Sequence, residues 1–234
     1  MRTTAIVIIL VILAAAGASA ADWQWPAQMS LGGFQITGIN GTANAQGSGT
    51  ATGLLQIPGM GNPSVSLSRS SQGSITGTVP VDARVSGGAL RGSFALSNNG
   101  LNGRGTLEFL SRSIDSSSIS ISNRGEARGS GSITLGRSSV PVDFSASGSA
   151  CSLSGDAPVK AQVDTPMASY KLNGRLAVRT SGGSLSGTLS GQVERTGNVS
   201  NQVTTSSIPN TRVDLSSGQC TVNVGGVSVT FSVL

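Results

Sequence analysis

The sequence has no histidine, and this absence excludes several kinds of catalytic site. Serine triads, histidine general bases and metal sites built on histidine all need that side chain. Ten acidic residues are scattered along the chain, so a pair of glycosidase carboxylates could form only by folding. Clefts that hold sugars also use aromatic residues, which make up only 3% of this sequence. We therefore expect no enzyme, no metal site and no cofactor.

The sequence also has little charge. Fifteen basic and ten acidic residues give a net charge of +5, with no run of lysine or arginine. Aromatic residues are too few for base stacking and no nucleic-acid motif is present, so we expect no nucleic-acid partner. Two explanations of the basic excess stay open. The charges either lie on solvated strand faces, or attract an anionic partner such as lipid headgroups or a cell-wall polymer.

Cysteine occurs only twice, as Cys151 and Cys220. In an exported protein such a pair is expected to form a disulfide. Closing a loop of about 70 residues would stabilise the fold by roughly 4 kcal/mol in the chain-entropy model. Two separate buried thiols are the alternative. Neither cysteine lies in a C-x-x-C motif, so the sequence does not indicate a redox site.

The first 20 residues have the pattern of a signal peptide. Arg2 gives a basic start, residues 5–16 form an apolar run, and Ala18-Ser19-Ala20 matches a cleavage site. A permanent membrane anchor is the alternative, but the run is short for a bilayer span. We expect export to the periplasm or the extracellular space, with residues 21–234 forming a single all-β domain. No later segment is apolar enough to cross a membrane as a helix.

Residues 168–194 carry the clearest pattern of the sequence. Apolar and polar residues alternate along two runs, which predicts two strands that each bury one face. Gly182-Gly183 lies between the runs and suits the turn of a β-hairpin. With this turn both apolar sets share one face. The predicted pairs are Leu176 with Leu189, Leu172 with Val193 and, on the polar face, Lys171 with Glu194.

Residues 73–110 predict three further strands in the same way. Gly87-Gly88 and Asn99-Gly100 serve as the two turns, and all three apolar sets then share one face. The predicted pairs are Val81 with Phe94, Phe94 with Gly105, and Arg91 with Glu108.

Short alternating segments separated by turn residues continue along the rest of the chain, and we expect about 14–16 strands and no helix. Asn40-Gly41 and Gly155-Asp156 are predicted as turns, and residues 196–210 as a loop-rich segment. A later hairpin would place Phe144 over Gly131, and a C-terminal hairpin would place Cys220 opposite Phe231. The predicted fold is an antiparallel meander curled into a barrel-like, half-barrel or sandwich form.

Glycine recurs on the predicted buried faces, and two explanations stay open. Glycine gives room for a large neighbour on the next strand. It could equally keep the floor of a groove shallow for an acyl chain. The runs Leu185-Ser186-Gly187-Thr188-Leu189-Ser190-Gly191 and Leu90-Arg91-Gly92-Ser93-Phe94 loosely resemble the β-groove proteins of envelope lipid transport, the lipopolysaccharide-transport bridge and the AsmA-like families. This resemblance implies lipid transport in the envelope but assigns no residue a role.

Two non-catalytic functions follow from these expectations. The first is the binding or carriage of an apolar, lipid-like ligand in the cell envelope. The second is a structural or adhesive surface component with no small-molecule ligand, whose apolar face is simply its core. The candidate groove residues are Val81, Phe94, Leu107, Leu172, Leu176 and Leu189. A carrier needs them to line an accessible cavity, whereas a structural protein packs them closely.

Overall fold

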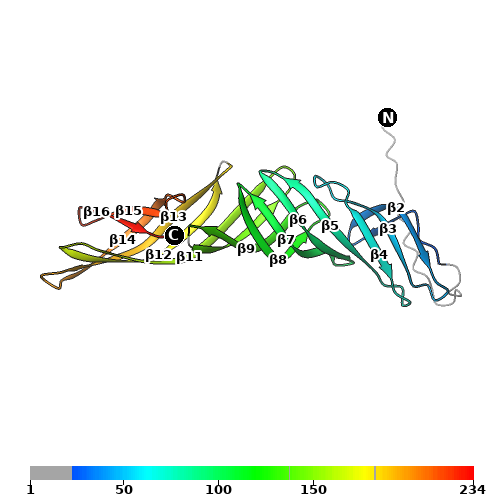
Figure 1. Cartoon of the computed structure of the whole chain (residues 1–234), viewed down its shortest axis with the longest axis horizontal. Helices are drawn as coiled ribbons and strands as arrows, with labels where there is room; N and C mark the ends of the chain where they lie inside the picture. The colour runs from blue at the N-terminus through cyan, green and yellow to red at the C-terminus, as the bar shows by residue number, and fades with distance from the viewer. Residues whose placement is uncertain (1–22, 137, 182) are drawn as a thin grey trace, which may run out of the picture.

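The computed structural model describes residues 23–136, 138–181 and 183–234, which form an elongated all-β molecule (Figure 1). Fourteen strands pair in chain order as one antiparallel meander curled into a half-barrel, and the last two strands form a separate small sheet. The predicted signal peptide, residues 1–20, lies outside the described residues. Within the described part of the chain no helix is long and apolar enough to cross a bilayer.

The described residues form sixteen strands, which agrees with the 14–16 expected from the sequence. Their bounds are β1 (Gln28–Leu31), β2 (Phe34–Ala43), β3 (Gly49–Gln56), β4 (Ser64–Arg69), β5 (Ile75–Val85), β6 (Gly88–Ser97), β7 (Gly100–Phe109), β8 (Arg112–Ile121), β9 (Ala127–Leu135), β10 (Ser138–Ala146), β11 (Cys151–Asp164), β12 (Ala168–Ser181), β13 (Ser184–Gly197), β14 (Val203–Val213), β15 (Gln219–Val224) and β16 (Val227–Ser232).

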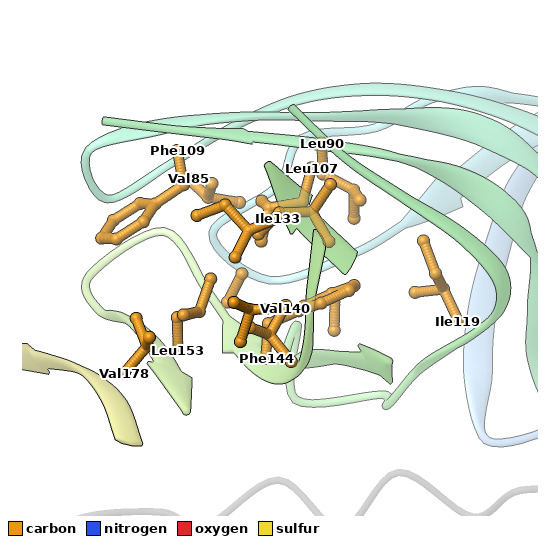
Figure 2. Packing of buried hydrophobic residues seen from close by; sticks show 14 of the residues in the cluster. Val85, Leu90, Leu107, Phe109, Ile119, Ile133, Val140, Phe144, Leu153 and Val178 are labelled. Carbon is orange, nitrogen blue, oxygen red and sulfur yellow. The ribbon is translucent and has the colours of Figure 1, made fainter. Parts of the chain in front are cut away.

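Burial alternates along the strands with the period of two that the sequence predicts. In β5, for example, Val79, Val81, Ala83 and Val85 are buried while the residues between them are exposed. The buried residues of β1–β16 belong to one continuous apolar cluster. Figure 2 shows part of it, with Val85 and Leu107 on one side of a shared interior and Val140 and Phe144 on the other. The apolar face of the meander is thus the core of the molecule.

Contacts between distant turns hold the sheet in its curled form. The amide of Ser86, in the β5–β6 turn, donates to the carbonyl of Ser147 after β10, at 3.0 Å. The Asn123 side chain, between β8 and β9, donates to the carbonyl of Gly33 in the β1–β2 turn, at 3.5 Å. These hydrogen bonds join hairpin ends that are several strands apart in the sheet. A flat sheet could not make them.

The β12–β13 hairpin has the register that its sequence predicts. Leu176 pairs with Leu189, Leu172 with Val193, and Lys171 with Glu194. The C-terminal hairpin is also as expected, since Cys220 pairs with Phe231. In both hairpins the sequence between the two strands is a pair of glycines, the residues best suited to such turns.

The registers predicted for β5–β7 and for Phe144 were wrong by two residues. Phe94 pairs with Val79 and Gly103, not with Val81 and Gly105. Phe144 pairs with Gly129 instead of Gly131. Gly88 is already paired with Val85, so the β5–β6 turn lies one residue earlier than expected. Because a shift of two keeps every side chain on its own face, the predicted buried set was still correct.

Two predicted turns lie inside strands. Asn40-Gly41 belongs to β2, and the chain reverses instead at Asn44, whose side chain accepts hydrogen bonds from the amides of Gln46 and Ser48. Gly155-Asp156 lies within the long strand β11. The segment predicted as loop-rich supplies most of β14. Favourable turn residues therefore do not ensure a turn where backbone pairing continues on both sides.

Candidate functional site

All six candidate groove residues lie on the inner face of the meander. Val81, Phe94 and Leu107 come from the neighbouring strands β5, β6 and β7, and the other three come from β12 and β13. Their exposed fractions lie between 0 and 4%. The structure thus places them in two groups along the elongated core (Figure 1), and each group is buried among its neighbours.

Phenylalanine rings lie against three of the inner-face glycines. A Cβ atom added to Gly129 would lie 2.6 Å from the ring of Phe144. Cβ atoms added to Gly92 and Gly103 would each lie 2.9 Å from the ring of Phe94. Gly129 and Gly103 lie on the strand next to the ring that covers them, the arrangement called aromatic rescue, whereas Gly92 lies on the same strand as Phe94. At these three positions the glycines accommodate a side chain of the protein itself.

The β15–β16 hairpin packs across the last strands of the meander. It contacts β11, β13 and β14, and Figure 1 shows it beside them near the C-terminus. Phe231 is fully buried and Val229 nearly so, both within the common apolar cluster. Because this hairpin is a separate sheet, side-chain packing rather than a continuous backbone ladder holds it in place.

The disulfide predicted between Cys151 and Cys220 is not formed, and both residues are free thiols. Cys151 lies at the start of β11, opposite Ala146, and burial raises the pKa of its thiol to about 11. Cys220 is buried on β15, and its sulfur lies 3.8 Å from the Arg212 carbonyl oxygen. The prediction rested on cysteine count and export, which do not fix where two cysteines lie. The structure matches the alternative of two separate thiols.

An open hollow of about 750 Å³ lies where β13, β14 and β15 meet the start of β8. Its lining combines the apolar Leu185 and Leu215 with Arg112 and Arg212. Asp214 also lines it, but its carboxylate accepts hydrogen bonds from Ser216 and Ser217 of its own loop. These bonds lower the pKa of Asp214 to about 2. The sequence analysis missed this hollow, because it forms from segments that are far apart in the chain.

The two tryptophans pack near the first strands. The rings of Trp23 and Trp25 meet edge to face with centroids 4.7 Å apart, and the guanidinium of Arg69 lies 4.3 Å above the Trp23 ring. The indole nitrogen of Trp25 donates to the carbonyl of Thr42 at 3.2 Å. The segment before β1 is therefore fastened to β2 and β4 by these aromatic side chains.

Several charged residues on the outer face form ion pairs. Arg91 bridges Asp82 and Glu108, Arg128 pairs with Glu126, and Arg179 pairs with Asp156. Each of these side chains is well exposed, so the pairs contribute little to stability. Within the described part of the chain, no three cysteine or acidic side chains gather as a metal site would require.

Comparison of the chain with protein families, curated proteins and solved structures finds no match.

Proposed function

We propose that this protein is an exported, non-catalytic structural or adhesive component of the cell surface or envelope. It works through its outer face and strand edges, and its apolar inner face serves as a core. The observation that carries this proposal is the burial of all six candidate groove residues, 0–4% exposed. A structural protein needs such a packed core, whereas a groove that holds a ligand leaves its lining accessible.

The inner-face glycines support the same proposal. Phe94 and Phe144 fill the space over the glycines beside them, so that space is taken by the chain itself. The outer face supplies the polar and charged residues that a contact surface needs. An anionic partner, such as lipid headgroups or a cell-wall polymer, remains the proposed partner for the basic excess of the chain.

Replacing Leu176 by aspartate tests this proposal. Leu176 is fully buried in β12, so an unpaired carboxylate there should cost at least about 4 kcal/mol. For a chain of this size we expect the midpoint of thermal unfolding to fall by roughly 10 °C or more, or folding to fail. Arg175→Asp, one residue away on the exposed face, is the matched control and should melt close to the wild type. A Leu176→Asp variant that melts like the control would contradict the proposal.

A carrier of apolar ligands is the second candidate, and one observation favours it. The β15–β16 hairpin packs on β11, β13 and β14 without joining their sheet, so moving it would uncover residues beneath it. A native mass spectrum of the mature protein from its own envelope distinguishes the two functions. A bound mass in the lipid range, lost on denaturation, would support the carrier. The mass of the mature chain alone supports the structural role.

A further inference from the structure

The last strand of the meander has one open edge. β14 pairs with β13 on one side. On its other side β15 lies beside the C-terminal part of β14, where Asp214 bridges Gln219 and Cys220 approaches Arg212. Over residues 203–208 the described part of the chain places no strand on this outer side. In Figure 1 the β13–β14 hairpin projects at the end of the molecule away from β2–β4.

The alternating direction of the backbone hydrogen bonds along β14 identifies the N–H and C=O groups that point to this open edge. The amide of Gly197 donates to the carbonyl of Gln202 at 3.0 Å, so residue 202 bonds toward β13. In an antiparallel ladder every second residue bonds to the same neighbour. Thr204 and Ser206 therefore bond toward β13, and Val203, Thr205 and Ser207 direct their N–H and C=O groups to the open side. These three residues form what we call the β14 edge.

The β14 edge lacks the features that normally prevent sheets from pairing. Proteins protect exposed edges with charge, proline, bulges or very short strands. Residues 203–208 contain no charge and no proline, and the bulge and Pro209 come only after them. At the other end of the meander, β1 is only four residues long. Val203 is also 55% exposed, so an apolar side chain stands uncovered beside the free backbone groups.

We propose that the β14 edge pairs antiparallel with the β14 edge of a second copy of this chain, forming a two-fold symmetric dimer. The symmetry places Thr205 opposite Thr205 of the other copy and Val203 opposite Ser207. All three positions are then hydrogen-bonded pairs, which use the free N–H and C=O groups of both chains. Because the segment is uncharged, a two-fold axis brings no like charges together. This pairing is argued from the β14 edge alone. If the protein has the proposed structural role, a second copy of the chain would be one of its partners.

Two variants at Thr205 test the pairing and its register. Thr205→Lys keeps the backbone amide but places two lysines opposite each other, and we expect the dimer dissociation constant to rise about tenfold or more. Mixing Thr205→Lys with Thr205→Glu should restore a dimer of one chain of each kind. Thr205→Ser keeps both the amide and the neutral charge and is the matched control. Sedimentation equilibrium over about 1–200 µM measures each mass, and circular dichroism checks each fold.

Amide exchange gives a second measurement on the unmodified protein. The amides of Val203, Thr205 and Ser207 should exchange more slowly as protein concentration rises, while the exposed loop amide of Val199 should not change. A wild-type monomer throughout the concentration range would overturn the proposal. So would a Thr205→Lys variant that dimerises like Thr205→Ser, or amides protected only when an unrelated extended peptide is added. None of these outcomes depends on whether a lipid is bound.

Discussion

Single residues of the inner face show how small and large side chains share the core. Phe94 and Phe144 lie over glycines of adjacent strands, and a Cβ at Gly129 would lie 2.6 Å from the Phe144 ring. Real Cβ atoms do not approach other atoms so closely, so the ring must move if Gly129 is enlarged. Gly129 and Phe144 therefore act as one packing unit.

Replacing Gly129 by alanine should destabilise the protein by about 1–3 kcal/mol, because the added methyl overpacks the core against Phe144. Phe144→Leu alone should also destabilise it, by loss of buried apolar surface. In the double variant the smaller leucine side chain leaves room for the added methyl. The double variant should therefore lose less stability than the sum of the losses in the two single variants. Urea unfolding of the wild type, the two single variants and the double variant measures this coupling. Strictly additive costs would show that the ring does not cover the glycine.

At the scale of elements, hydrogen bonds from a turn's backbone to one of its own side chains fix its geometry, in addition to the effect of glycine. Asn44 organises the β2–β3 turn by accepting from the amides of Gln46 and Ser48. Asp214 does the same between β14 and β15, where it accepts from the amide and hydroxyl of Ser216 and the hydroxyl of Ser217. Asp214 thus holds the connection that brings the C-terminal hairpin back onto the meander.

This connection should be sensitive to acid. The hydrogen bonds lower the pKa of Asp214 from its ordinary 3.8 to about 2. A depressed folded-state pKa means that the charged form stabilises the fold above about pH 4, and that this contribution is lost as the pH falls toward 2. Asp214→Asn should therefore unfold at lower urea concentration than the wild type at pH 7, with the difference shrinking between about pH 4 and pH 2.

Ser216→Ala is the companion variant, because it removes the side chain that contributes most to lowering the pKa of Asp214. It should lose part of the same stability at pH 7. A difference between wild type and Asp214→Asn that stays constant from pH 7 to pH 2 would show that the carboxylate charge is not involved.

At the scale of the whole molecule, turn-to-turn contacts convert a meander into a half-barrel. Gly125, between β8 and β9, has a φ of +75°, and a Cβ there would clash with the carbonyl oxygen of Pro58 in the β3–β4 loop. Gly225 in the β15–β16 turn has a φ of +58° but nothing within 4 Å of an added Cβ. The two glycines need the same backbone conformation, and only Gly125 also touches a distant turn.

The variants Gly125→Ala and Gly225→Ala separate these two effects. Gly225→Ala should cost about 1–2 kcal/mol, from the left-handed backbone alone. Gly125→Ala should cost a further 1–3 kcal/mol or so, because the methyl forces the two turns apart. Thermal or urea unfolding of both variants gives the difference. Equal losses of stability in the two variants would mean that the contact of Gly125 with Pro58 does not help to hold the sheet in its curled form.

The sequence by itself determined most of the strands, their buried faces and the registers of the β12–β13 and β15–β16 hairpins. These properties depend on alternation and on turn residues, which act between neighbours in the chain. Alternation alone fixes a face but not a register, so the pairs of Phe94 and Phe144 were predicted two residues away from their true partners.

Only the tertiary structure decided how the sheet curls, and with it the state of the candidate site. Closure depends on contacts such as that of Asn123 with Gly33, 90 residues apart, which no local pattern encodes. This closure buries the six groove candidates, places Cys151 and Cys220 as separate thiols and leaves the β14 edge open. Each of these outcomes depends on which segments meet in space, and side-chain chemistry along the chain does not determine that.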